Sequence, residues 1–182
     1  MAIDDGTLKT KPVFEFDLTD LTVDAVRESV KSRYPEIRID SRDYFKLYSE
    51  YTERFLRGEK HTTIRFEDGE IDLPIKNELP LLVNTQDNPE EINYIGDVTV
   101  NTITIKRFDD LTEEDALLDG FESRQDAITA LKRIYPTVTS EDLVTIYSIE
   151  PSESISELQQ RFRPSTEWIP HLECRRLSSY LS

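Results

Sequence analysis

One short stretch, residues 58 to 65, most constrains the fold, because it joins a helical pattern to a strand pattern with almost no linker. Upstream, residues 49 to 57 place apolar side chains at helical spacing behind a serine that can cap the helix. Gly58 then offers the left-handed conformation that commonly ends a helix. Downstream, apolar and polar residues alternate, as in a strand with one buried face. The stretch therefore predicts a helix that turns directly into a strand.

The alternation sorts the side chains of this strand onto two faces. Ile64 and Phe66 share the face that we expect to be buried, whereas Thr63 and Arg65 share the opposite face. Lys60 comes just before them, in the turn between helix and strand. We therefore expect an amine, a hydroxyl and a guanidinium to lie together on a concave surface.

The spacing Gly-x-Lys-x-x-Thr-x-Arg resembles the signature of the ASCH family, and all four fixed positions match, at Gly58, Lys60, Thr63 and Arg65. Three later segments are similar to the family's helical insert and closing strand: residues 111–123, 131–136 and 143–149. The resemblance implies an α+β fold, namely a PUA-like small β-barrel with helices across one mouth. It also implies a link to RNA and modified nucleosides.

The resemblance covers residues 44 to 150 and so divides the chain into three segments. Residues 1–43 form an N-terminal extension with a strand and a helix, and residues 151–182 form a C-terminal helical tail. The extension either packs against the barrel or offers a surface to a partner. The tail, which carries Trp168 and several arginines, either docks on the domain or contacts RNA or a partner. A protein-interaction module that works through the termini therefore stays open as a function.

Turn and cap residues predict the elements around the motif. Asp68 and Gly69 favour a hairpin between the strand of the motif and the next strand. Because Pro80 has no N–H, we expect the following strand to begin after it. Apolar residues change parity within residues 92–108, which predicts a bulge. Thr112 and Ser123 are expected to cap two helices that lie across the mouth of the barrel.

Some small ASCH members are amidohydrolases that remove an acetyl group from N4-acetylcytidine, and the resemblance implies a lysine, a threonine and an acidic residue as their working groups. Carried over by position, these are Lys60, Thr63 and Asp119. The chain departs from those members at Asp119, where they have glutamate, so its carboxyl group stands on a shorter side chain. Two functions stay open for the cleft: recognition of RNA or a modified nucleoside, and hydrolysis of an N-acylated pyrimidine nucleoside.

The chemistry of such a set is plausible on physical grounds. A threonine hydroxyl needs a base to take its proton, and lysine serves as that base only if burial lowers its pKa. Asp119 follows a predicted helix, whose dipole disfavours an anion there and so raises the pKa of the carboxyl group. Each residue also has a plainer interpretation: Lys60 as a surface cation or phosphate ligand, Thr63 as an ordinary strand residue, and Asp119 as a solvated carboxylate.

Other side chains near the motif have two interpretations each. Arg65 is expected to bind an anion or to brace the site through a carboxylate. Tyr48, Tyr51 and Phe121 either stack on a base or belong to the core. His61 is expected to be exposed.

Composition narrows the class of ligand. A formal net charge of −15 repels a long phosphate backbone, which favours a nucleoside, a nucleotide or a short RNA loop over a duplex; the plainer interpretation is that the acidity serves solubility. One cysteine and two histidines predict no internal disulfide, no metal site and no cofactor, so that an enzyme here would be metal-independent. No apolar run approaches the roughly 20 residues of a membrane span, and we expect a cytoplasmic protein.

Overall fold

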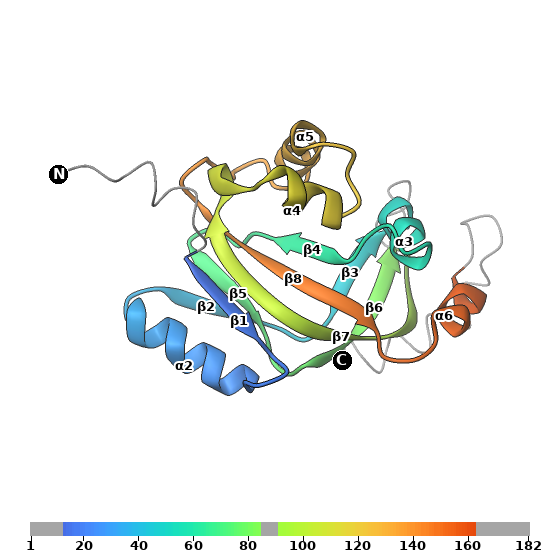
Figure 1. Cartoon of the computed structure of the whole chain (residues 1–182), viewed down its shortest axis with the longest axis horizontal. Helices are drawn as coiled ribbons and strands as arrows, with labels where there is room; N and C mark the ends of the chain where they lie inside the picture. Colours follow the sequence, from blue (N-terminus) through green and yellow to red (C-terminus); the bar gives the residue numbers. More distant parts are fainter. Residues whose placement is uncertain (1–12, 85–90, 163–182) are drawn as a thin grey trace.

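The computed structural model describes residues 13–84 and 91–162 (Figure 1). The predictions for residues 1–12, and for the tail with Trp168, lie outside the described residues. No described helix is both long and apolar enough to span a membrane.

The chain alternates short helices with strands. The strands are β1 (Phe14–Asp17), β2 (Arg38–Arg42), β3 (Phe45–Tyr48), β4 (Thr62–Arg65), β5 (Glu70–Pro74), β6 (Glu78–Asn84), β7 (Ile92–Arg107) and β8 (Leu143–Pro151). The helices are α2 (Val23–Arg33), α3 (Ser49–Leu56), α4 (Glu113–Leu118), α5 (Arg124–Ile134) and α6 (Ile155–Arg161), with a 3-10 turn, η1, at Phe108–Asp110.

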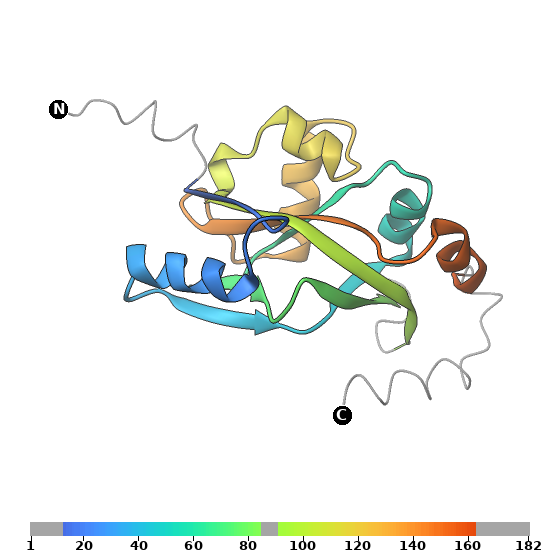
Figure 2. The same cartoon turned by 60° about the horizontal axis from the view of Figure 1, so that its bottom comes forward.

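A curled sheet organises these elements, in the order β3-β6-β7-β8-β4, with β1 also paired to β7. The strands β2 and β5 form a separate parallel pair. Figure 1 shows α4 and α5 together on one side of β4 and β8. In Figures 1 and 2, α2 runs alongside β2. The predicted α+β class, a curled small sheet accompanied by helices, is confirmed.

The long strand β7 bends where its apolar pattern changes parity. Its register against β8 shifts between Val100 and Thr102, which leaves Asn101 as the extra residue. Val98 and Val100 are buried before the shift, and Ile103 and Ile105 are buried after it. The bulge therefore lets one strand contribute side chains of both parities to the same core. The predicted bulge is confirmed.

The predicted hairpin is wrong. The motif strand β4 pairs antiparallel with β8, and β5 pairs with β2, so that only an isolated bridge between Glu67 and Glu70 joins the two sides of the turn. Asp68 and Gly69 do form a turn, with φ of +75° at the glycine. The turn was therefore predicted correctly, but each of the two strands beside it pairs with a strand from a distant part of the sequence.

Two local predictions also need correction. Ser49 does not cap α3: Tyr48 occupies the cap position, and the Ser49 hydroxyl is buried without a hydrogen-bond partner. The strand β6 begins before Pro80, at Glu78. Pro80 is tolerated because β6 pairs only with β7 at this point, since the pairing with β3 begins at Leu81.

The caps predicted for the two helices after β7 are confirmed. The Thr112 hydroxyl accepts from the N–H of Asp115, whose carboxylate accepts from the N–H of Thr112, so that α4 begins with a complete capping box. The Ser123 hydroxyl accepts from the N–H of Asp126 at the start of α5.

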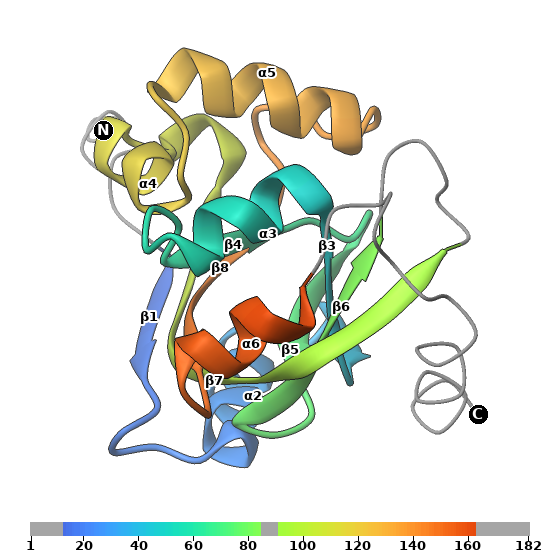
Figure 3. The ribbon, with the colours of Figure 1, turned by 90° about the vertical axis from the view of Figure 1, so that its right-hand side faces the viewer.

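The segments before residue 44 and after residue 150 both contribute side chains to the main core. In the N-terminal part, Phe14, Val26 and Val30 are buried in the main apolar cluster. After β8, Leu158 of α6 is completely buried in the same cluster. Figure 3 shows α6 beside α3 and β7, and the Gln159 side chain donates to the backbone oxygen of Leu56 at 2.9 Å. The described parts of both flanking segments therefore pack on the sheet, while the segment boundaries stay a prediction.

Leu158 gives a test of how much α6 contributes to stability. Leu158→Ala should lower the free energy of unfolding by about 2–5 kcal/mol, because it leaves a cavity in the main core. Ile155→Ala, an exposed position on the same helix, should change it by no more than about 0.5 kcal/mol. Urea unfolding of both variants checks this, and equal, small losses would contradict the docking of α6.

Candidate functional site

The motif lies where α3, β4 and the turn between α4 and α5 meet. Gly58 follows α3 with φ of +79°, as predicted. Ile64 and Phe66 are buried in an apolar cluster shared with α5, and Thr63 is buried on the other face of β4. Arg65 is half-buried, and His61 is exposed, as expected. The alternation of the motif strand is therefore confirmed.

Lys60 and Asp119 form a buried ion pair. Lys60 is 4% exposed and Asp119 is 3% exposed. The Lys60 ammonium donates to the Asp119 carboxylate and, at 3.4 Å, to the Asp119 backbone oxygen. The interpretations of Lys60 as a surface lysine and of Asp119 as a solvated carboxylate are both wrong. The structure thus joins the motif to a residue 59 positions away in the chain.

Hydrogen bonds to backbone oxygens of Leu118 and Gly120 hold the turn after α4 against the motif. The His61 N–H donates to the Leu118 backbone oxygen at 2.6 Å. The Arg54 guanidinium donates to the Gly120 backbone oxygen at 2.9 Å. At Gly120, φ is +90°, and an added Cβ would stand 3.2 Å from the Cβ of Lys60, so this close approach favours glycine. Asp119 is therefore positioned by the residues on both sides of it.

Burial moves the pKa values of the pair toward each other. Burial raises the pKa of the Asp119 carboxyl group, although the charge of Lys60 opposes the shift. Burial likewise lowers the pKa of Lys60, and Asp119 opposes that shift. The raised pKa of Asp119 agrees with the sequence-based expectation, but burial is its first cause rather than the helix dipole. Both shifts make the charged form of each group less favourable than in water, while the charge of the partner offsets part of that cost.

Four of the five predicted site residues line one small cavity, whereas Gly58, predicted to bind the ligand, is not part of its lining. Lys60, Thr63, Arg65 and Asp119 all border a space of about 30 Å³, together with Phe121 and apolar side chains of α5. A space of that size holds one or two water molecules or a small substituent, since one water needs roughly 10–15 Å³. The inner cavity, as we call it, thus brings an amine, a hydroxyl and a carboxyl group to one place.

A larger space, the outer cavity, adjoins the inner one, because Tyr51, Arg65 and Tyr135 border both. Its volume is about 220 Å³. Among the described residues no Asp or Glu lines it. Its lining is instead aromatic and cationic, with four tyrosines and three cations: Tyr44, Tyr48, Tyr51, Tyr135, Arg42, Lys46 and Arg65.

Of the aromatic residues predicted either to stack on a base or to belong to the core, two lie in the core and the third packs against them and borders the outer cavity. Tyr51 and Phe121 are buried and meet edge to face at 5.9 Å between ring centroids, as core residues do. Tyr48 packs against that cluster and also borders the outer cavity. Sequence reasoning missed Tyr44 and Tyr135, because their role depends on the approach of β3 to the end of α5.

Sequence reasoning also missed a second buried polar network, which includes Arg42 from the lining of the outer cavity. The Arg42 Nε donates to the Asp72 carboxylate at 2.7 Å, and Asp72 is 1% exposed. The Tyr147 hydroxyl lies 2.8 Å from the same carboxylate oxygen. Burial, with Asp72 second, raises the pKa of Tyr147, so its hydroxyl stays a donor. Arg42 is thereby held in place from inside the protein.

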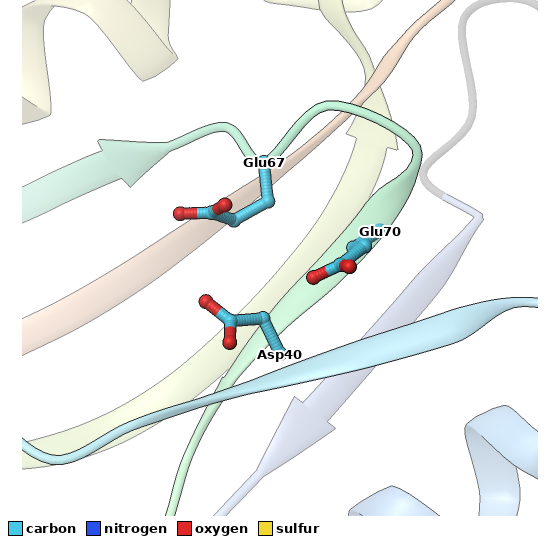
Figure 4. A group of neighbouring side chains, drawn as sticks. All are labelled: Asp40, Glu67 and Glu70. Carbon is cyan, nitrogen blue, oxygen red and sulfur yellow. The ribbon is translucent and has the colours of Figure 1, made fainter.

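Three carboxylates gather elsewhere, between β2 and the turn before β5. The side chains of Asp40, Glu67 and Glu70 point toward one another, with ligand atoms within 4.8 Å (Figure 4). Burial, then the charges of Asp40 and Asp72, raise the pKa of Glu67. Arg38 pairs with Glu70 at 3.1 Å and partly offsets the repulsion. Because acidic side chains gather in this way without binding an ion, we assign the cluster no function.

Comparisons with known proteins leave the function open. No protein-family model and no curated protein matches the sequence. Among solved structures, the fold is similar to an ASCH domain from Lactobacillus crispatus JV V101, at 16% identity and a TM-score of 0.41, over 71% of this chain and 87% of that one. It is also similar to a DUF984-family protein from Enterococcus faecalis V583, at 12% identity and a TM-score of 0.41, over 71% and 92%. Likenesses of this size decide neither family nor function.

The buried pair can be tested by its effect on stability. Lys60→Met should lower the free energy of unfolding by about 3–5 kcal/mol, because it leaves the Asp119 carboxyl group buried without its partner. The double variant Lys60→Met/Asp119→Leu should lose less than the sum of the two single losses, since no unpaired group remains. Urea unfolding of Lys60→Met, of Asp119→Leu and of the double variant measures these losses.

A nearby exposed pair serves as the control for that cycle. Arg57 and Glu59 lie 3.0 Å apart on the surface, so Arg57→Met should leave the free energy of unfolding unchanged. Strictly additive losses in the Lys60 and Asp119 cycle would show that the pair is not coupled.

Proposed function

We propose that the protein is an ASCH-type domain that binds RNA or a modified nucleoside in the cleft formed by the inner and outer cavities. The observation that carries this proposal is the lining of the outer cavity, with four tyrosines, three cations and no described acidic side chain, in a chain whose formal net charge is −15. Aromatic rings stack on bases of any kind, and cations attract the negative end of a nucleotide. The match at Gly58, Lys60, Thr63 and Arg65 supports the same proposal.

The size of the cleft supports a small ligand. Pockets for small molecules usually measure about 300–1,000 Å³. The outer cavity, at about 220 Å³, lies just below that range and is open to solvent. It suits one nucleoside, or one unstacked base of a short RNA loop, and it is too small for a duplex. Acidity over the rest of the chain favours the same conclusion.

Binding of a nucleoside panel tests the proposal. Arg65→Ala should weaken binding of N4-acetylcytidine, measured by calorimetry, by about tenfold or more, because Arg65 borders both cavities. Arg57→Ala, which removes an exposed arginine outside the cleft, should leave the affinity unchanged. If both variants bind like the wild type, the cleft is not the binding site.

The buried pair favours a second candidate function, hydrolysis of an N-acylated pyrimidine nucleoside. As a neutral amine, Lys60 would take the proton of the Thr63 hydroxyl, and the Thr63 oxygen would attack the acyl carbonyl carbon. Asp119 would give its proton to the departing amide nitrogen as the carbon–nitrogen bond breaks. Water would then cleave the acyl-threonine ester and release the carboxylic acid. The pKa directions of both groups support these roles.

Turnover of N4-acetylcytidine under single-turnover conditions separates the two functions. In an enzyme, Lys60→Ala and Asp119→Asn should each abolish turnover while the variants stay folded. Asp119→Glu should raise the rate, because it brings the carboxyl group closer to the leaving nitrogen, and a misplacement of about 1 Å can cost on the order of a hundredfold. If neither the wild type nor Asp119→Glu shows turnover while nucleoside binding persists, recognition stands and the enzyme is discarded.

A further inference from the structure

The three cations of the outer cavity come from elements that sequence reasoning did not connect. Arg42 ends β2, Lys46 lies in the middle of β3, and Arg65 ends β4. Along β3 the buried side chains are Phe45 and Leu47, so Lys46 projects on the opposite face, toward the cavity that it borders. Three positive charges thus converge on one concave space without a described carboxylate in its lining.

Arg42 is fixed in its position. Its Nε donates to Asp72 at 2.7 Å, and its Nη1 donates to the Tyr44 backbone oxygen at 3.1 Å. Its Nη2 donates to no described residue. Asp72 in turn is held by the Tyr147 hydroxyl. Because Asp72 and Tyr147 are buried, the guanidinium meets a ligand in one orientation, and little conformational freedom is lost on binding.

Arg65 contacts the same aromatic ring as Arg42. The guanidinium carbons of Arg42 and Arg65 lie 5.8 and 5.7 Å from the centroid of the Phe45 ring. The Nη2 of Arg65 also donates to the Lys46 backbone oxygen at 2.9 Å, which ties Arg65 to β3. Phe45 is completely buried, so both arginines are arranged around a rigid part of the core.

From this convergence the geometry points to a phosphate subsite in the outer cavity, formed by Arg42, Lys46 and Arg65, so that the ligand is a nucleotide rather than a free nucleoside. The inference rests on the proposed function of the cleft and specifies its ligand. A phosphate offers several acceptor oxygens and up to two negative charges, which matches two guanidinium groups and an ammonium better than a neutral ribose does. In a chain with so many acidic residues, a local cationic cavity also directs the phosphate to one place.

Calorimetry with a matched series of probes tests this subsite. The probes are N4-acetylcytidine, its 5′-monophosphate, and a dinucleotide in which a phosphodiester precedes the same nucleoside. The phosphorylated probes should bind the wild type about tenfold more tightly than the nucleoside, and high salt should reduce the difference. Tighter binding of the dinucleotide assigns the phosphate to an RNA chain, and tighter binding of the monophosphate assigns it to a free nucleotide.

Two charge reversals on exposed lysines distinguish a local effect of the subsite from the effect of the protein's net charge on phosphate binding. Lys46→Glu and Lys76→Glu change the net charge equally, but Lys76 lies in the turn between β5 and β6, outside the cavity. Lys46→Glu should abolish the preference for phosphorylated probes over the nucleoside, whereas Lys76→Glu should keep the preference. Arg42→Lys, which retains a charge next to Asp72, should reduce the preference without unfolding the protein.

The outcomes that overturn the inference are distinct from those that overturn the proposed function. Equal affinity of the wild type for the nucleoside and its phosphorylated forms, or equal effects of Lys46→Glu and Lys76→Glu, removes the phosphate subsite and leaves nucleoside recognition in place. If no probe binds, both the subsite and the proposed function are wrong.

Discussion

The cleft depends on one buried ion pair, between Lys60 and Asp119. Removing two charges from water costs several kcal/mol per ion, and their attraction offsets this cost only when the geometry is good. The chain meets this condition by fixing both partners through their neighbours. Arg54 and His61 hold the turn after α4, and the conformation of Gly120 lets that turn approach Lys60. The pair thus adds a side-chain link to the hydrogen bonds that already join the motif to the turn after α4.

A second buried carboxylate contacts a cation of the outer cavity in the same way. Asp72 is buried, and it holds Arg42 at the wall of the outer cavity, as Asp119 holds Lys60 at the inner one. In both cases a buried carboxylate orients a cation that borders the cavity. A strongly acidic chain therefore uses two of its acidic groups in the interior to position positive charge at one concave site, while the lining of the outer cavity, among the described residues, carries no acidic side chain.

Local patterns predicted the motif well, because its geometry follows from short-range rules. Alternation placed Ile64 and Thr63 on opposite faces of β4, and the capping box of α4 follows from Thr112 and Asp115, which are three residues apart. The same rules cannot give strand pairing. The turn at Asp68 and Gly69 formed as predicted, yet the flanking strands found partners far along the chain.

Local sequence rules could not identify the residues whose role depends on strand pairing. Arg42 and Asp72 are 30 positions apart and meet because β2 lies parallel to β5. The sequence likewise marked Asp119 as an acid at a helix end, but it did not show that burial, more than the helix dipole, would shift its pKa. Long-range pairing and depth of burial are thus the two quantities that sequence patterns left undetermined.

The proposed phosphate subsite and the proposed hydrolytic mechanism place opposite demands on Lys60. As a base, Lys60 must be neutral, and the positive charge of Arg65 is among the causes that lower its pKa. A phosphate bound to Arg65 brings negative charge nearby, which offsets that effect and favours the protonated lysine. Protonated Lys60 can donate a hydrogen bond to a base or acyl oxygen, but it cannot activate Thr63. A ligand that uses the phosphate subsite would therefore favour recognition over hydrolysis, whereas an unphosphorylated nucleoside would leave the pKa of Lys60 lowered, as a base requires.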